Sequence, residues 1–244
     1  MDYMHNMFLG WLQYLYGSIF HLLVFTRMGD TPLANLFEIQ TWIVSFQKAN
    51  NVEYKYGHRL DKLSMFQKKS GYPRLRGRAG DIMGLDATML GLWTQHMDAG
   101  NVVHKRIRLI LDLNVRISKI LHEFSPKHGH FNVPEPAYGR LKSMALDMAQ
   151  LHVQVLEHFQ AEGSKIFNMT SKTHFALHSL LLAQHIHPAL VWCFKGESMM
   201  RRTSTIWKSC VDGSRHWQVS IKAALKYRTA FTLFKREEAN ARNA

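Results

Sequence analysis

Three side chains in this sequence are of types that could support metal-dependent chemistry on a phosphate: Asp2, His5 and Glu197. Asp2 and His5 directly precede an apolar stretch, and Glu197 lies in a run rich in aromatic residues and methionine. Phosphoryl transfer commonly uses two divalent metal ions, and Mg²⁺ prefers carboxylate oxygens. Acids are scarce, with 18 Asp and Glu against 31 Lys and Arg. An acid among apolar residues needs a partner because an unpaired buried carboxylate is costly. Asp2 and Glu197 are therefore candidate metal ligands.

Both acids also have a structural interpretation. Arg201 follows Glu197 by four residues, which is the spacing of an ion pair on an exposed helix face. Spacing alone favours this ion pair, because surface acids outnumber catalytic ones. Asp2 could orient His5 rather than bind a metal directly, and it lies at a chain end, where fraying is common.

The order of these motifs resembles the catalytic region of cut-and-paste DNA transposases of the CACTA and Kyakuja-like groups. Those proteins carry D-x-M-H-x-x-x-L-G after the second active-site acid and W-x-F-x-x-E around the third, with a K-x-H…H…P order between them. The matching residues here are Asp2, Met4, His5, Leu9, Gly10, Lys172, His174, His178, Pro188, Trp192, Phe194 and Glu197. Two departures stand out: Gly196 occupies a position where the transposases often have a bulkier residue, and the strands that carry the first acids have no counterpart here.

The resemblance implies that the chain corresponds to the helical insertion and the last catalytic helix of an RNase H-like transposase core. It implies a fragment or degenerate relative of a transposase that binds DNA in the nucleus and does not cut DNA alone. Asp2, His5 and Glu197 would be the catalytic residues, with Mg²⁺ or Mn²⁺ held by Asp2 and Glu197 in an active protein.

Two histidines offer a different metal site. His174 and His178 are one helical turn apart, a spacing that lets two imidazoles bind one zinc ion. The residue after His174 is Phe175 rather than Glu, so the metalloprotease pattern is not met, and no cysteine pair completes a structural site. Ordinary core or surface histidines are the competing interpretation.

The formal net charge of +13 indicates a polyanionic partner, although charge that only aids solubility is the alternative. Lys and Arg neutralise phosphates whatever the base sequence. The candidate DNA-binding residues are Arg74, Arg76, Arg78, Arg201, Arg202 and Lys208. The two cysteines, Cys193 and Cys210, fit a reducing compartment better than a disulfide framework.

Residues 7–25 contain no charged side chain and are about long enough to cross a bilayer. Gln13, Gly17, Ser18 and His21 interrupt this stretch, and neighbouring helices satisfy such groups more cheaply than lipid does. A buried helix is therefore favoured. Two alternative functions remain: a membrane-associated protein anchored by these residues, with a membrane location, and a helical interaction module. The expected partners are DNA and, as an open alternative, a second copy of the chain.

Helical periodicity predicts a mainly α protein, a multi-helix bundle in a single domain over residues 1–235 with a polar tail at 236–244. Residues 101–124 and 137–162 are expected to be the best-formed helices, separated by a candidate linker at 125–136 with three prolines. Further helices are expected at 33–49, 81–97, 171–184, 191–211 and 217–234, with Asp81 as a cap.

Overall fold

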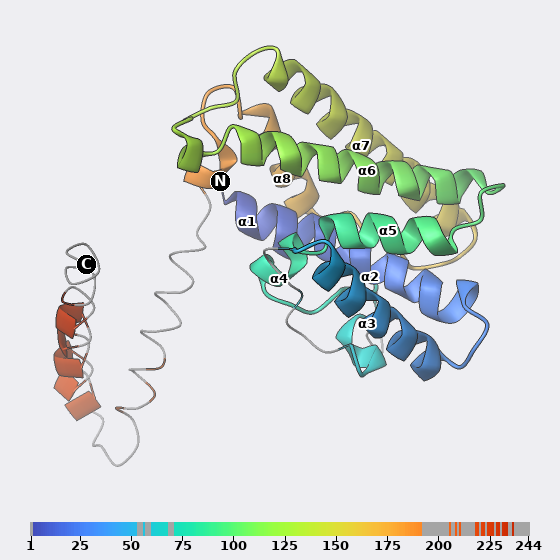
Figure 1. Ribbon diagram of the computed structural model, residues 1–244, viewed down its shortest axis with the longest axis horizontal. Helices are drawn as coiled ribbons and strands as arrows, with labels where there is room; N and C mark the ends of the chain where they lie inside the picture. The colour runs from blue at the N-terminus through green and yellow to red at the C-terminus, as the bar shows by residue number, and fades with distance from the viewer. Residues whose placement is uncertain are drawn as a thin grey trace. The chain divides into compact units, whose positions relative to one another are not determined.

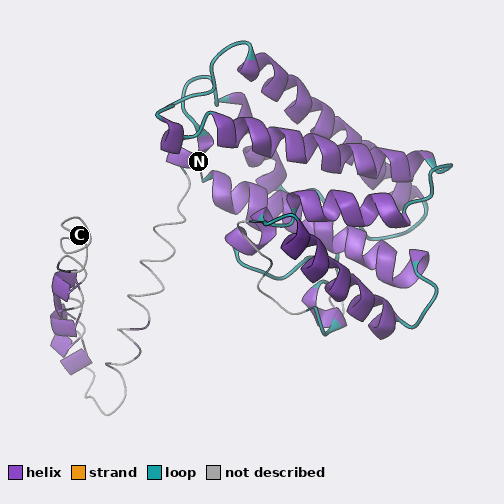
Figure 2. Ribbon diagram, in the orientation of Figure 1, coloured by secondary structure: helices purple, strands orange, loops and turns teal. Residues whose placement is uncertain are grey.

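The computed structural model describes residues 2–52, 56, 60–67 and 71–191, together with helical residues scattered between 205 and 236. The chain divides into two compact units, Met1–Trp192 and Cys193–Ala244. The single domain expected over residues 1–235 stays a prediction. The first unit is a helical bundle, as predicted (Figure 1). Figure 2 shows helices and loops, and no strand, in the described part of the chain.

The centre of the first unit is one continuous helix. It comprises α1 (Tyr3–Asn6), a π-helical segment (Met7–Leu12), α2 (Gln13–Leu22) and a second π-helical segment (Leu23–Arg27). This is the one helix among the described residues that is long and apolar enough to cross a membrane, and 78% of its most apolar window is buried inside the protein. The other helices of the unit cover it and thereby bury its side chains (Figure 1).

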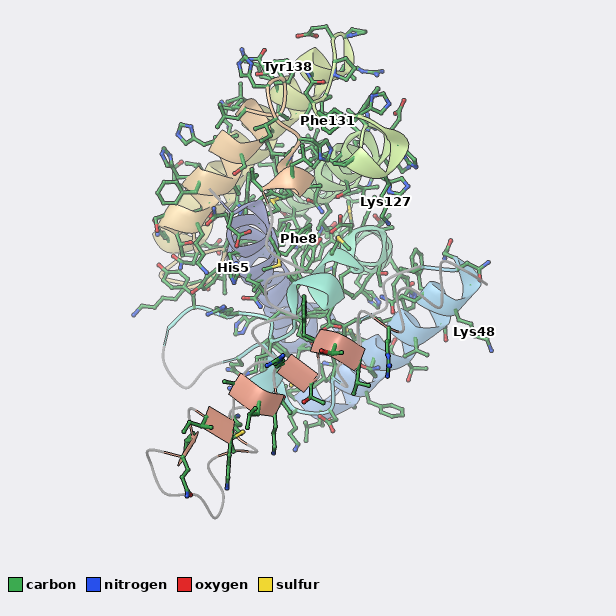
Figure 3. All side chains as sticks on the ribbon, turned by 90° about the vertical axis from the view of Figure 1, so that its left-hand side faces the viewer. His5, Phe8, Lys48, Lys127, Phe131 and Tyr138 are labelled. Carbon is green, nitrogen blue, oxygen red and sulfur yellow. The ribbon has the colours of Figure 1, made fainter. Side chains whose placement is uncertain are left out.

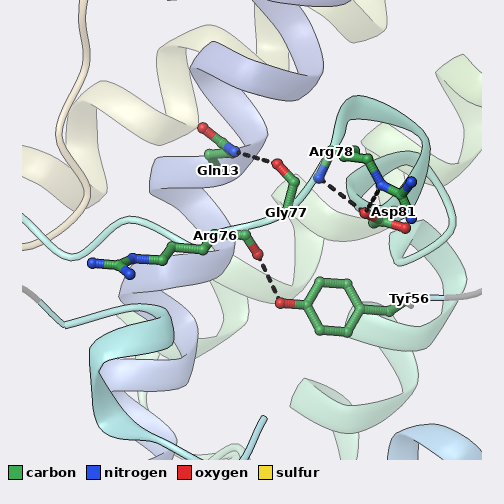
Figure 4. Close-up of polar contacts among 6 residues, drawn as sticks. All are labelled: Gln13, Tyr56, Arg76, Gly77, Arg78 and Asp81. Carbon is green, nitrogen blue, oxygen red and sulfur yellow. Dashed lines mark hydrogen bonds and ion pairs between the residues drawn. The ribbon is translucent and has the colours of Figure 1, made fainter. Parts of the chain in front are cut away.

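Two residues that interrupt the apolar stretch, Gln13 and Gly17, contact a segment from later in the chain. The Gln13 main-chain oxygen accepts the Leu75 N–H at 2.9 Å. The Gln13 side chain accepts from Arg74 Nε at 2.7 Å. It also donates to the Gly77 oxygen at 3.3 Å (Figure 4). Gly17 permits this approach, because a Cβ there would lie 2.7 Å from the Leu75 nitrogen. Both residues therefore suit a helix surrounded by protein.

A second set of polar contacts joins the central helix to His152 of a later helix and to Phe167 in the loop that follows that helix. Ser18 Oγ accepts the Phe167 N–H at 2.7 Å. Trp11 Nε1 donates to His152 Nδ1 at 2.7 Å, and His152 Nε2 lies 3.1 Å from the Phe167 oxygen, to which it donates in the matching tautomer. Burial lowers the pKa of His152 to about 4, partly offset by the bond to Phe167, so the imidazole is neutral at physiological pH.

The remaining helices of the first unit pack around this centre. They are α3 (Pro32–Ala49), α4 (Ala79–Met83), α5 (Asp86–His96), α6 (Val102–Glu123), α7 (Ala137–Ala161) and α8 (Ser171–Leu181). The long helices α6 and α7 lie side by side and run in opposite directions (Figure 1). The candidate linker at 125–136 is the connection between them, with a 3-10 turn at Pro126–His128 and Gly129 in the left-handed region at φ 83°.

Most predicted helices agree with the structure. The predictions for 33–49, 101–124 and 137–162 are confirmed within one residue by α3, α6 and α7. The 171–184 helix ends earlier, at Leu181. The single helix predicted over 81–97 is wrong: the chain turns at Gly84, which separates α4 from α5. Asp81 is not the first cap residue that was predicted: Arg78 holds that position, and Asp81 lies at the third position of α4, where its carboxylate accepts the Arg78 N–H at 2.9 Å.

The second unit is described only at isolated positions. Thr205, Lys208 and Cys210 are helical, and Cys210 is buried. The described positions between 218 and 233 are also helical, as predicted for 217–234. Most of the predicted 191–211 helix and nearly all of the 236–244 tail lie outside the described residues.

Candidate functional site

Asp2 and His5 form a pair at the start of the central helix. Asp2 Oδ1 accepts the Met4 N–H at 3.1 Å and caps the helix, while Asp2 Oδ2 is bonded to His5 Nδ1. Both side chains are partly exposed. Figure 3 shows His5 close to Phe8 on the same first turns. Because both carboxylate oxygens are engaged, the geometry suits an acid that orients a histidine.

The first turn of α8 packs directly against these residues of the central helix. A Cβ at Gly10 would lie 2.6 Å from Lys172 Cβ, so only glycine allows the two helices to approach this closely. Lys172 Nζ lies 3.4 Å from the Leu9 oxygen, to which it donates. Two motifs that are about 160 positions apart in the chain are therefore neighbours in space: the one with Leu9 and Gly10, and the one with Lys172 and His174.

His174 and His178 lie on α8 with their side chains exposed. Their Nε2 atoms are 3.0 Å apart and the rings meet edge to face. That separation allows a shared proton or a shared metal ion. Across the ranges that the structure describes, no group of three or more His, Cys, Asp and Glu side chains is arranged to hold a metal ion. The two-histidine metal site stays a prediction.

Three residues of the predicted catalytic and basic sets lie beyond what the structure describes. Glu197, Arg201 and Arg202 fall outside the described residues. Lys208 is exposed on a helix of the second unit. The pairing of Asp2 with Glu197 at a metal therefore also stays a prediction.

The three arginines of the 74–78 segment have different environments. Arg74 is held by Gln13, and its guanidinium lies 5.7 Å from the centre of the Tyr14 ring. Arg78 is exposed and forms an ion pair with Asp81 at 3.2 Å. Figure 4 shows the Arg76 side chain pointing away from that pair, and it is exposed as well. Arg76 and Arg78 can reach a polyanion, whereas Arg74 holds this segment to the central helix.

A buried polar cluster between α2, α5 and α6 was not found by sequence reasoning. Asp86 accepts hydrogen bonds from Tyr16 at 2.8 Å and from Ser118 at 2.5 Å, and Asn114 donates to the Tyr16 hydroxyl at 3.2 Å. Burial raises the pKa of Asp86 to about 6, and the hydrogen bonds from its neighbours limit the rise. The cluster joins three helices through one carboxyl group.

A basic groove between α6 and α7 was also missed. It has a volume of about 440 Å³. It is lined by Arg116, Lys119, Ile120, Glu123, Arg140, Ser143 and Met144. The sequence offered one signal, the cations on one side of a predicted helix at residues 105, 108, 116 and 119. It gave no indication that Arg140 of the next helix would join them.

No protein family, curated protein or solved structure matches this chain. Interpretation of its function therefore depends on the motifs and the geometry described above.

Proposed function

We propose that this chain is a DNA-binding relative of the catalytic region of cut-and-paste transposases. The observation that supports it best is the packing of Lys172 against Leu9 and Gly10. Residues from two separate motifs of the proposed family meet there, and the contact requires the glycine of one motif. The net charge of +13 supports a polyanionic partner and, with DNA as that partner, a nuclear location.

The described residues fit DNA binding better than DNA cleavage. Asp2 caps its own helix and is hydrogen-bonded to His5, which supports a role in orienting the histidine. We assign Asp2 as the acid that orients His5. Glu197 remains the candidate for the third acid of the family pattern. The helical bundle would then correspond to the insertion that precedes this acid in the transposase core.

The test combines binding and cleavage of short DNA duplexes by the purified chain. We expect binding without strand cleavage in Mg²⁺ or Mn²⁺. Replacing Arg201, Arg202 and Lys208 together by Ala should weaken binding alike for duplexes of different sequence, because these residues would contact phosphates. Absence of DNA binding at low salt would overturn the proposal. Strand cleavage that persists in Glu197→Ala would show that the catalytic residues are wrongly assigned.

A second candidate function, a helical interaction module, is supported by the outer face of α3. Leu33, Phe37 and Val44 are exposed there and recur at helical spacing along one stripe. Such a stripe suits pairing with another helix, including one from a second copy of the chain. Light scattering discriminates the candidates: a dimer that Phe37→Glu converts to a monomer, with no DNA binding, would favour this second function.

The membrane alternative is supported only by the length and composition of Tyr3–Arg27. A membrane anchor would have to leave the bundle, which would expose the partners of Gln13, Ser18 and Trp11. Flotation with neutral lipid vesicles tests this alternative, because insertion of an apolar helix needs no lipid charge.

A further inference from the structure

The exposed face of α6 carries a row of cations. Lys105, Arg108, Arg116 and Lys119 are spaced by three, eight and three residues, which places them on one side of the helix. Their span of 14 residues corresponds to roughly 21 Å. Asp112 lies in the same row and forms an ion pair with Arg116 at 2.8 Å, so the row keeps a net positive charge.

The groove between α6 and α7 is the point where this row gains a cation from a second helix. Arg140 of α7 joins Arg116 and Lys119 of α6, while Glu123 is the single acid among the lining residues. Arg116 has Asp112 as its partner, and neither Lys119 nor Arg140 forms an ion pair within the described part of the chain. The groove lies near the connection between α6 and α7. Figure 3 labels Lys127 and Phe131 in this connection and Tyr138 at the start of α7.

We propose that this groove, with the α6 row leading to it, binds the phosphate backbone of duplex DNA. The inference rests on the proposed function and identifies the surface that performs it. An Arg guanidinium can donate two parallel hydrogen bonds to a phosphate, and Arg116 and Arg140 both line the groove. B-DNA has one phosphate per about 3.4 Å of axis on each strand. Because the strand winds around that axis, a straight row of roughly 21 Å faces only part of the about six phosphates along its length.

The lining also distinguishes duplex from single-stranded nucleic acid. Proteins that bind unpaired strands stack the bases on aromatic side chains. None of the seven residues that line the groove is aromatic. The lining residues therefore offer donors to a backbone and no aromatic ring on which a base could stack.

The experiment compares two double variants that each remove two positive charges. Lys119→Ala/Arg140→Ala alters the groove, and Lys48→Ala/Lys165→Ala is the control, because both of its lysines are exposed and lie outside the groove. Affinity for a fluorescent DNA duplex is measured over a range of salt concentrations, and circular dichroism verifies folding. We expect the groove variant to bind the duplex roughly tenfold more weakly, and the slope of log K against log salt to become shallower by about two. The control should lose much less affinity.

The outcomes separate this inference from the proposed function. If the unaltered chain binds no duplex at low salt, the proposed function fails and the groove inference fails with it. If the chain binds duplex but the two double variants lose the same affinity, DNA binding stands and the groove inference is wrong. Glu123→Gln should tighten binding, because it removes the one carboxylate from the lining. Loss of binding to single-stranded RNA or anionic vesicles in the groove variant, with duplex binding intact, would overturn the assignment to duplex DNA.

Discussion

Asp86 and His152 are both buried in the first unit, and loss of hydration shifts their pKa values in opposite directions. The pKa of Asp86 rises to about 6 and that of His152 falls to about 4, so burial favours the neutral form of each. Their effects on stability consequently have opposite signs over the same pH range, and single substitutions are needed to separate them.

For Asp86, the folded-state pKa of about 6 lies above the ordinary value of 3.8. The stabilising contribution of the protonated acid is therefore complete below pH 4 and is lost as the pH rises towards 6. The loss is at most about 3 kcal/mol for a shift of this size. Because Asn cannot ionise, the free energy of unfolding of Asp86→Asn should increase relative to that of the unaltered chain as the pH rises from 4 to 7. Urea denaturation at several pH values measures this difference. Parallel pH profiles for the two proteins would contradict the assignment.

For His152, the folded-state pKa of about 4 lies below the ordinary value of 6.5. Its contribution is complete above pH 6.5 and is lost as the pH falls towards 4, because only the unfolded state takes up the proton. His152→Leu should cost about 2–4 kcal/mol at pH 7, since it leaves the Trp11 donor and the Phe167 acceptor unpaired. The difference from the unaltered chain should narrow at acidic pH. A difference that stays constant down to pH 4 would show that His152 does not titrate as described.

These two buried groups could not have been identified from the sequence. Each looks like an ordinary polar residue on an amphipathic helix, and its partners are remote in the chain. Tyr16 precedes Asp86 by 70 residues, and Trp11 precedes His152 by 141. Hydrophobic periodicity reports which face of a helix is buried, but it does not report which distant side chain will satisfy a polar group on that face. The Asp2–His5 pair could be predicted from the sequence because the two residues are only three positions apart.

At the scale of elements, the long helices were predictable and the breaks were not. The boundaries of α6 and α7 follow from Asn101, Ser125 and Gly163, which cap or end a continuous apolar face. The turn at Gly84 was missed because apolar residues continue across it, from Ile82 to Leu85. The π-helical segments of the central helix were missed because the apolar pattern does not distinguish them from α-helix.

The crossing at Gly17 gives a prediction at this scale. A Cβ there would lie 2.7–2.8 Å from main-chain atoms of Arg74 and Leu75, which cannot move away without breaking their hydrogen bonds. Gly17→Ala should destabilise the bundle by more than about 2 kcal/mol, although Ala is intrinsically the better helix former by about 1 kcal/mol. Gly80→Ala is the matched control, because nothing lies within 4 Å of its Cβ. Thermal unfolding followed by circular dichroism measures both, and equal melting temperatures would show that the crossing tolerates a methyl group.

For the whole molecule, the net charge of +13 predicts a steep dependence of DNA affinity on salt. Each neutralised phosphate releases counterions, so log K should fall linearly with log salt, with a slope of about −0.9 per contact. Anisotropy titrations between low and physiological salt measure this slope. Binding that does not change with salt would remove the electrostatic basis for the proposed function.

The central position of Tyr3–Arg27 also has a consequence for protein synthesis. Its hydrogen-bonded partners lie as far as Phe167, 149 residues after Ser18. A ribosome adding about 5–20 residues per second needs roughly 8–30 s to make that interval. During this time the most apolar helix of the chain is outside the ribosome before the last of the residues that surround it exist. We therefore expect the nascent chain to depend on a chaperone, or on a slow rate of initiation, to avoid aggregation.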